Sequence, residues 1–487
     1  MKRISTTIAI LAIAAFGLQA QDKTYFVSPE GNDNADGLSV TNAWKSIDKV
    51  NASVFQAGDR VLFEGGATFY GNLVIKSSGS PEKPIVFSGY GQGRPVINMG
   101  KEEGTAITIL NSDGLEIVGF EITSGFPPEV GVGRNGIFID EREPGRAFSH
   151  IVIKDNYIHD IWGQMGGTRL RCAAISGGVM RPWRGFTVSQ NASTLEDVLI
   201  EGNRIERVDK VGITTTGIDK LRVRRNYMDN LGGDGIIVSS SFRAVVEFNE
   251  IHRSCMRSGL LDLPGDNGWA EKGEGWWPHT AACWIIGCEE TIMQFNEVYD
   301  TGRQIRNGDG FAYDFDFYCK RCIAQYNYSK ENHGFLLLMY DIFENVARYN
   351  ISENDKTHLV QMQGSLKSDN NVLYNNVFYV DHGVSEVEYF RGDHPEKAKD
   401  INDLGAHFYN NIFYATGQGQ FRTAWSVGYA WDRSFDDTLK PDLPAGSLFL
   451  NNCYFGPWKN GIPDDPKAIV ADPKFVDPGT GGTGLGT

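Results

Sequence analysis

A short phrase built around an Asn recurs about ten times along this chain, and it limits the fold more than any other feature. The phrase holds an apolar residue, two further residues, the Asn, one residue and another mostly apolar residue, as in IVIKDNYI and VLIEGNRI. The repeated residues are Asn156, Asn203, Asn226, Asn249, Asn296, Asn327, Asn350, Asn376, Asn411 and Asn452. Their successive spacings are 47, 23, 23, 47, 31, 23, 26, 35 and 41 residues. A base period near 23, with some gaps doubled or stretched, indicates stacked coils that carry loop insertions.

Each phrase reads as a short strand followed by a turn. Apolar residues alternate over four to six positions and are rich in Val, Ile, Phe and Tyr, which favours strands over helices. Asn tolerates the left-handed conformation of a sharp turn, and Asn side chains stacked once per coil can hydrogen-bond along their column. The pattern therefore predicts an all-β fold, a single-stranded parallel β-helix with strands roughly 4.8 Å apart. A β-sandwich would need hairpin turns about every 8–12 residues and gives no reason for an Asn column.

The first twenty residues have the features of a secretory signal peptide. Lys2 and Arg3 give a positive start, residues 8–17 are apolar, and Ala20 is a small residue at the expected cleavage point. No other stretch approaches about 18 consecutive apolar residues, so no membrane span is predicted. We therefore expect a protein that is exported to the periplasm or out of the cell.

The rest of the chain divides into three parts. Residues 21–105 should form an N-terminal cap and the first strands, residues 106–460 the β-helix repeats, and residues 461–487 a Gly-rich tail. Residues 44–50 (WKSIDKV) have helical spacing, and we expect this helix to cover the exposed end of the stack. The tail lacks an apolar capping element at the other end.

The net charge bears on nucleic-acid binding, and the cysteines bear on metal binding and disulfides. A net charge of −15 and a pI near 5.1 argue against nucleic acid as a partner. Of seven Cys residues, Cys319 and Cys322 form a C-x-x-C, but no second pair or His has the spacing of a zinc site. A disulfide or buried thiols are the expected alternatives, and the odd number leaves at least one thiol free or intermolecular.

Two insertions concentrate residues suited to binding sugars. Residues 162–190 carry four Arg residues, among them Arg171. Residues 255–285 carry four Trp residues and a His, including Trp276, Trp277 and His279. Aromatic faces stack on sugar rings, and guanidinium groups suit carboxylate or sulfate. The alternative is that these side chains only pack on the coils.

The segment NGDGFAYDFD (307–316) concentrates three carboxylates, Asp309, Asp314 and Asp316. Residues two apart on a strand point to the same side, so Asp314 and Asp316 should project together with Cα atoms about 6.5–7 Å apart. Glycoside hydrolysis needs one protonated and one ionised carboxyl, about 5–5.5 Å or 6.5–9.5 Å apart. Asp-Gly turn chemistry and Ca²⁺ binding by the D-x-D oxygens are the alternatives.

A second repeated phrase, Gly followed by Ile or Phe, predicts the register of the coils. Alignment on the Gly places Asp234, Asp309 and His333 in one column. Four positions further lies a second predicted column, which contains Asp140, Thr216, Ser239, Asp314 and Leu338. Asp234 and His333 are therefore expected beside the acidic segment. Asp234 would have a structural role or bind sugar, and His333 would be an acid, base or sugar ligand, or else a surface residue or one whose bonds are satisfied internally.

Two other functions stay open. A uronate lyase needs a base and a cation that neutralises the substrate carboxylate; Arg306 flanks the acidic segment, but no Lys stands out as the base. A non-catalytic carbohydrate-binding surface protein is the other alternative. A Ser-His-Asp arrangement and a phosphate loop are both absent from the sequence, which argues against esterase and nucleotide functions.

Nearly all of the mature chain resembles the right-handed parallel β-helix proteins of the pectate-lyase-like superfamily, of the kind exported by polysaccharide-degrading Bacteroidetes. The resemblance rests on YFVSPEGNDNADG, GDRVLFEGGATFYG, the Asn ladder and NGDGFAYDFD…CIAQYNYSKENHGFLLL. By analogy with the superfamily's hydrolases, whose sites are Asp clusters on neighbouring coils, it implies catalytic roles for Asp309, Asp314 and Asp316. The chain departs from the polygalacturonase pattern, because the segment has no adjacent Asp-Asp pair and His333 lies in Asn-His-Gly, not Gly-His-Gly.

The sequence thus predicts an exported polysaccharide-active enzyme, a glycoside hydrolase on a β-helix. Asp314 and Asp316 would act as acid and as base or nucleophile, with Asp309 and His333 assisting. The expected sugar-binding residues are Trp276, Trp277, His279, Arg306, Arg171 and Asp234. The expected partner is an oligosaccharide or polysaccharide, with an acidic one left open, and we expect a monomer. No residue is assigned to a metal, and Ca²⁺ is left open as a cofactor.

Overall fold

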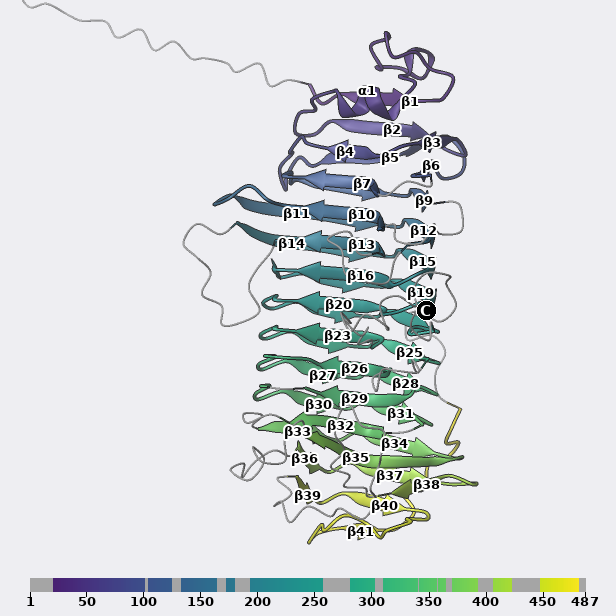
Figure 1. Ribbon diagram of the computed structural model, residues 1–487, viewed down its shortest axis with the longest axis vertical. Helices are drawn as coiled ribbons and strands as arrows, with labels where there is room; N and C mark the ends of the chain where they lie inside the picture. The colour runs from purple at the N-terminus through teal and green to yellow at the C-terminus, as the bar shows by residue number, and fades with distance from the viewer. Residues whose placement is uncertain are drawn as a thin grey trace, which may run out of the picture.

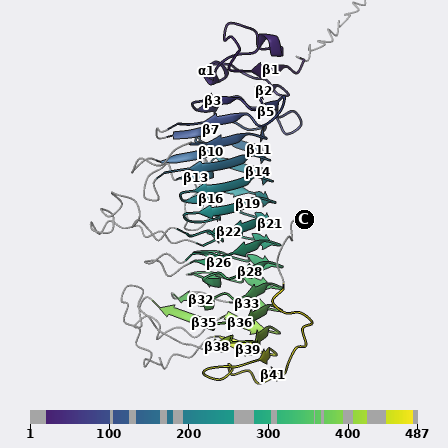
Figure 2. The ribbon, with the colours of Figure 1, turned by 90° about the vertical axis from the view of Figure 1, so that its right-hand side faces the viewer.

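The computed structural model describes residues 21–100, 104–124, 133–163, 172–179, 193–256, 281–302, 310–339, 341–356, 358–364, 370–392, 406–422 and 447–480. In these residues the chain winds into stacked coils, with α1 and β1 at one end and β41 at the other (Figures 1 and 2). The strands pair in parallel and form three long sheets, here called A, B and C. The predicted parallel β-helix is confirmed.

A typical coil contributes one strand to each sheet. Sheet A contains β1 (Thr24–Val27), β2 (Arg60–Glu64), β5 (Ile85–Tyr90), β8 (Leu115–Val118), β11 (Ala147–Lys154), β14 (Thr194–Glu201), β17 (Ile218–Asp219), β18 (Arg222–Arg224), β21 (Val245–Glu247), β24 (Ile292–Gln294), β27 (Ile323–Gln325), β30 (Val346–Arg348), β33 (Asn371–Tyr374), β36 (Ala406–Tyr409) and β39 (Leu448–Leu450). Sheet B contains β3 (Thr68–Tyr70), β6 (Val96–Asn98), β9 (Glu121–Thr123), β12 (Tyr157–Ile161), β15 (Arg204–Val208), β19 (Tyr227–Leu231), β22 (Glu250–His252), β25 (Glu297–Tyr299), β28 (Tyr328–Lys330), β31 (Ile351–Glu353), β34 (Val377–Val380), β37 (Ile412–Ala415), β40 (Cys453–Phe455) and β41 (Ile469–Val470). Sheet C contains β4 (Leu73–Ile75), β7 (Gly104–Leu110), β10 (Arg134–Asp140), β13 (Ala173–Gly178), β16 (Val211–Thr216), β20 (Ile236–Ser239), β23 (Cys283–Ile286), β26 (Phe311–Phe315), β29 (Gly334–Leu338), β32 (His358–Gly364), β35 (Val384–Gly392) and β38 (Gln420–Arg422).

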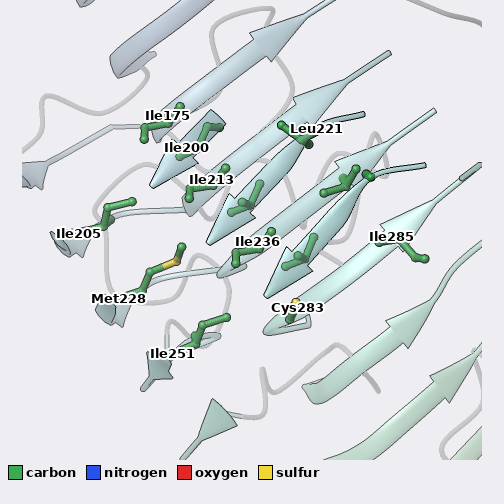
Figure 3. Packing of buried hydrophobic residues seen from close by; sticks show 14 of the residues in the cluster. Ile175, Ile200, Ile205, Ile213, Leu221, Met228, Ile236, Ile251, Cys283 and Ile285 are labelled. Atoms are coloured by element: carbon green, nitrogen blue, oxygen red, sulfur yellow. The ribbon is translucent and has the colours of Figure 1, made fainter. Parts of the chain in front are cut away.

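The interior of the coils is a continuous apolar core. Inward side chains from the three sheets, such as Ile200, Ile205 and Ile213, are fully buried and point toward one another (Figure 3). Because each position repeats once per coil, like side chains stack directly above one another, and burying them supplies the main driving force for the stack.

A hydrogen-bonded ladder of buried Asn side chains runs along the corner between sheets A and B. Asn226 is typical: its Nδ2 donates to Asn249 Oδ1 at 2.9 Å and to the Ile200 carbonyl at 3.0 Å. The backbone N–H of Asn226 donates to the same Asn249 oxygen at 3.1 Å. The pattern continues from Asn156 to Asn452, where Asp465 Oδ2 accepts the last two bonds. The predicted column of bonded Asn side chains is confirmed.

The left-handed residue of each turn is the one before the ladder Asn, so the expectation that the ladder Asn itself adopts this conformation is wrong. Phe248, Phe295 and Tyr326 have φ of 56°, 54° and 54°. Their rings stack face to face on the outside, with centroids 4.9 Å and 5.1 Å apart. The turn residue lies outward, which leaves the Asn free to point inward and bond the backbone.

The N-terminal end differs from expectation. The helix predicted over residues 44–50 is only the five-residue α1 (Ile47–Asn51), preceded by a 3₁₀ turn at Val40–Asn42. A capping helix is therefore not supported. A helix this short buries little area by itself. The aromatic side chains beside it, Trp44 and Phe55, are each 5% exposed and cover the first coils.

The remaining features concern thiols and membranes. The Cys residues are thiols and not disulfides, and Cys319 and Cys322 are fully buried. Within the part of the chain that the structure describes, no helix has the length and apolar character needed to cross a bilayer.

Adjacent Asn residues offer a test of the ladder. Asn411→Ala removes the Oδ1 that accepts from the N–H and Nδ2 of Asn376, and the Nδ2 that donates to the Leu373 carbonyl. We expect a loss of about 3 kcal/mol in the free energy of unfolding, because buried groups lose their partners. Asn410→Gly is the matched control: Asn410 is exposed with φ of 54°, so the change should stay within about 0.5 kcal/mol. Equal urea midpoints for both variants would contradict a stabilising ladder.

Candidate active site on the outer face of sheet C

Asp314 lies in the middle of β26 and faces outward. Its strand neighbours Tyr313 and Phe315 belong to the apolar interior, so the alternation of the strand turns Asp314 to the outer face. In register, Asp314 is flanked by Trp284 of β23 and Leu337 of β29. A carboxylate therefore sits between two apolar side chains contributed by the adjacent coils.

Asp316 follows directly after β26 and lies on the same side, since it is two residues beyond Asp314. The Phe317 N–H donates to Asp316 Oδ1 at 2.7 Å. Asp314 is 5% exposed and Asp316 8% exposed. The two carboxyls thus face outward, as predicted from their spacing, but are largely enclosed.

The register predicted by aligning the Gly residues is correct for the early coils and wrong for the later ones. Ile236 pairs with Cys283, and Cys283 pairs with Tyr313. The position of Asp234, two residues before Ile236, is therefore level with Phe311. The second predicted column is confirmed through Asp140, Thr216 and Ser239. It then continues through Ile286 and reaches the level of Asp316, instead of passing through Asp314 and Leu338.

Asp234 is an internal anchor and not a surface sugar ligand. It is 2% exposed, and its Oδ1 accepts from Trp284 Nε1 at 2.8 Å and from the Ala281 N–H at 3.1 Å. Burial raises the pKa of Asp234 to about 6, and nearby Lys210 opposes the rise. Asp234 lies two coils from Asp314. Trp284 of the coil between them donates to Asp234 and is level with Asp314 in the sheet.

His333 does not join the carboxyl pair. It precedes β29, four residues before Leu337, which places it about 13 Å along the strand direction from the level of Asp314. The centroid of its ring lies 6.0 Å from that of Phe311 and 6.2 Å from that of His358. Its backbone N–H donates to Thr301 Oγ1 at 3.1 Å. His358 Nδ1 in turn lies 2.8 Å from Glu386 Oε2. His333 therefore belongs to a polar row at the edge of the sheet.

Six of the predicted site residues lie outside the described residues: Asp309, Trp276, Trp277, His279, Arg306 and Arg171. The structure adds Gln361, which the sequence analysis did not select, and places Trp284, one of the four Trp residues of the second insertion, on β23. Gln361 is level with Leu337 and 2% exposed, and no described group accepts a bond from its Nε2. The available signal was their position, because both occupy outward sites of strands in the same column as Asp314.

The described residues offer no cluster of three or more His, Cys, Asp or Glu side chains arranged to hold a metal ion. Ca²⁺ takes about 6–8 oxygen ligands, which also come from backbone and amide carbonyls, so a calcium role of the D-x-D oxygens stays open. Acid–base chemistry is what the two carboxyls can perform by themselves.

Comparisons with known proteins agree on the architecture. A family model described as a right handed beta helix region matches residues 96–268. Two crystal structures of a GH136 lacto-N-biosidase from Eubacterium ramulus superpose with a TM-score of 0.60 at 21% and 22% identity, covering 82% of this chain and 67% and 68% of theirs. The fold is a right-handed parallel β-helix.

A similarity in sequence extends over most of the chain. A lacto-N-biosidase from Bifidobacterium longum subsp. longum is 27% identical over 537 residues, which covers 92% of this chain and 31% of that protein. The chain thus spans less than a third of the length of this curated relative.

Buried carboxyls elsewhere in the coils make stability depend on pH. Glu388 is 5% exposed, and burial raises its pKa to about 7, against hydrogen bonds from Ser447 and the Ala406 N–H. Burial likewise raises the pKa of Asp355 to about 6, although Ser329 and Ser352 donate to it. The folded state therefore binds these protons more tightly than the unfolded state does.

The stability contributed by the Glu388 proton is complete below its ordinary pKa and is lost as the pH rises through 7. We expect this group alone to lower the free energy of unfolding by about 3 kcal/mol between pH 4.5 and pH 8. Glu388→Gln cannot ionise, so its unfolding free energy should fall less over that range. Urea unfolding at the two pH values measures the difference, and equal slopes for both proteins would contradict a buried, protonated Glu388.

Proposed function

We propose that the protein is a glycoside hydrolase that acts on an oligosaccharide or polysaccharide. The observation that carries this proposal is the similarity to a lacto-N-biosidase through 92% of the chain. It is supported by two neighbouring carboxyls on the outer face of a β-helix, which glycoside hydrolysis requires.

The two carboxyls would take different roles. We assign the general-acid role to Asp314, which lies in register between Trp284 and Leu337. We assign the role of base or nucleophile to Asp316, whose Oδ1 accepts a hydrogen bond from the Phe317 N–H. Asp309, on the same segment, remains a third candidate, and His333 remains one for the rim of the site.

The substrate is proposed from the loops and from the relative. Trp276, Trp277 and His279 would contact sugar rings, while Arg171 and Arg306 would suit an acidic group. The relative's name makes glycosides of lacto-N-biose the first substrates to test. We further propose export, which the character of residues 1–20 supports.

Substitution of the carboxyls tests the assignment. Asp314→Asn and Asp316→Asn preserve shape and remove the acid–base function, so each should lower kcat by at least about 100-fold while the protein stays folded. Asp300→Asn is the matched control, because Asp300 is exposed at the end of β25 with φ of 53°, which Asn tolerates. Release of p-nitrophenol from the p-nitrophenyl glycoside of lacto-N-biose, and of reducing ends from a glycan panel, measures the rates.

The same panel separates the rival functions. An unsaturated product that absorbs ultraviolet light, with activity lost to a chelator, would replace the hydrolase by a lyase. Binding without turnover on every glycan would indicate a carbohydrate-binding protein. Full activity in both Asp variants would overturn their catalytic roles.

A further inference from the structure

Trp284 lies on the outer face of sheet C, on the strand next to that of Asp314. It occupies an outward position of β23, level with Ile237 on one side and Asp314 on the other. Its side chain packs against the buried cluster of Ala173, Val211 and Ile237, of which Ile237 is its neighbour in the sheet. The Trp284 side chain is only partly buried, whereas the three residues of that cluster are between 0% and 6% exposed.

Asp234 fixes the orientation of this indole. The 2.8 Å bond from Trp284 Nε1 and the 3.1 Å bond from the Ala281 N–H hold one carboxylate oxygen from two sides. A buried Trp usually needs one partner for its N–H, and a buried carboxylate needs donors, so each group satisfies the other. The ring is thereby held in one position across the coils.

Stability alone does not explain this pair. The column of Asp234 is otherwise apolar nearby, with Ala173 and Val211 before it and Ala281 after it. An apolar residue at 234 would avoid the cost of burying a carboxyl, since burial already raises its pKa. The buried Asp234 carboxyl thus holds the partly exposed indole of Trp284, which is level with Asp314.

We propose that Trp284 is a sugar-stacking floor that binds a pyranose ring adjacent to the bond cleaved at Asp314, and that Asp234 is its positioning residue. Because this inference rests on the proposed glycosidase function, it names one subsite of the same site. The ring surface of Trp284 offers the apolar contact that the flat face of a sugar requires, and the fixed indole lowers the entropy cost of binding. The substrate then runs from Asp314 toward the N-terminal coils.

Kinetics on the p-nitrophenyl glycoside of lacto-N-biose test the floor. Trp284→Ala should lower kcat/KM at least about 30-fold, mainly through KM, whereas Trp284→Phe keeps a ring and should lose less. Tyr70→Ala is the control, because Tyr70 is an aromatic residue of sheet B that is 74% exposed far along the stack, and activity should not change.

The anchor is tested by two substitutions. Asp234→Val matches its apolar column and should leave the urea midpoint equal or higher while raising KM about tenfold, because the indole loses its fixed position. Asp234→Asn keeps an oxygen acceptor for the indole N–H and should restore most of the loss. A lower midpoint with an unchanged KM in Asp234→Val would assign the pair a purely structural role.

Binding separates this inference from the function it rests on. Calorimetric titration of Asp314→Asn with lacto-N-biose should show binding that Trp284→Ala, added to the same protein, removes. Binding lost in this way without hydrolysis by the native protein would keep the floor and overturn the hydrolase. Hydrolysis that Trp284→Ala leaves unchanged would overturn the floor alone, and a folded protein that binds no glycan of the panel would overturn both.

Discussion

The buried Asn ladder is the interaction on which the rest of the structure depends. Every coil must turn sharply between sheets A and B, and the turn would leave backbone N–H and C=O groups unsatisfied in the interior. Each ladder Asn bonds the backbone of one neighbouring coil and the side chain of the next, as Asn226 does between Ile200 and Asn249. The ladder thereby fixes the phase of each coil relative to the next, and with it the stacking of the core.

Because the coils are fixed in register, side chains from different coils can form a site on the outer face. Asp314, Trp284 and Leu337 come from three different coils and lie side by side only because their strands are locked in register. The same rigidity holds Asp234 under the indole of Trp284. In a repeated scaffold the inward residues form the core, so the outward residues can differ from coil to coil. On sheet C, Trp284 and Asp314 are such outward residues on adjacent strands.

Much of the fold could be read from the sequence because its signals are local and periodic. The alternation around each Asn predicted the strands, and the D-x-D spacing predicted that Asp314 and Asp316 share a side. The Gly alignment failed at later coils, because eleven residues, 300–310, separate β25 from β26, but only three separate β28 from β29. Gly310 and Gly334 therefore do not lie at the level of Gly235. Asp234 is level with Phe311 and His333 with Gly310, where the alignment placed both level with Asp309.

The sequence by itself determined the architecture: a parallel β-helix built on an Asn column, with an acidic segment on one of its coils. The architecture could be predicted because both the period of the repeats and the alternation of apolar residues in the strands are visible in the sequence. Only the tertiary structure decided which side chains meet across coils, such as Trp284 with Asp234 and Asp314. Those meetings depend on the lengths of the segments between strands and on burial by neighbouring coils, and neither is encoded in any single repeat.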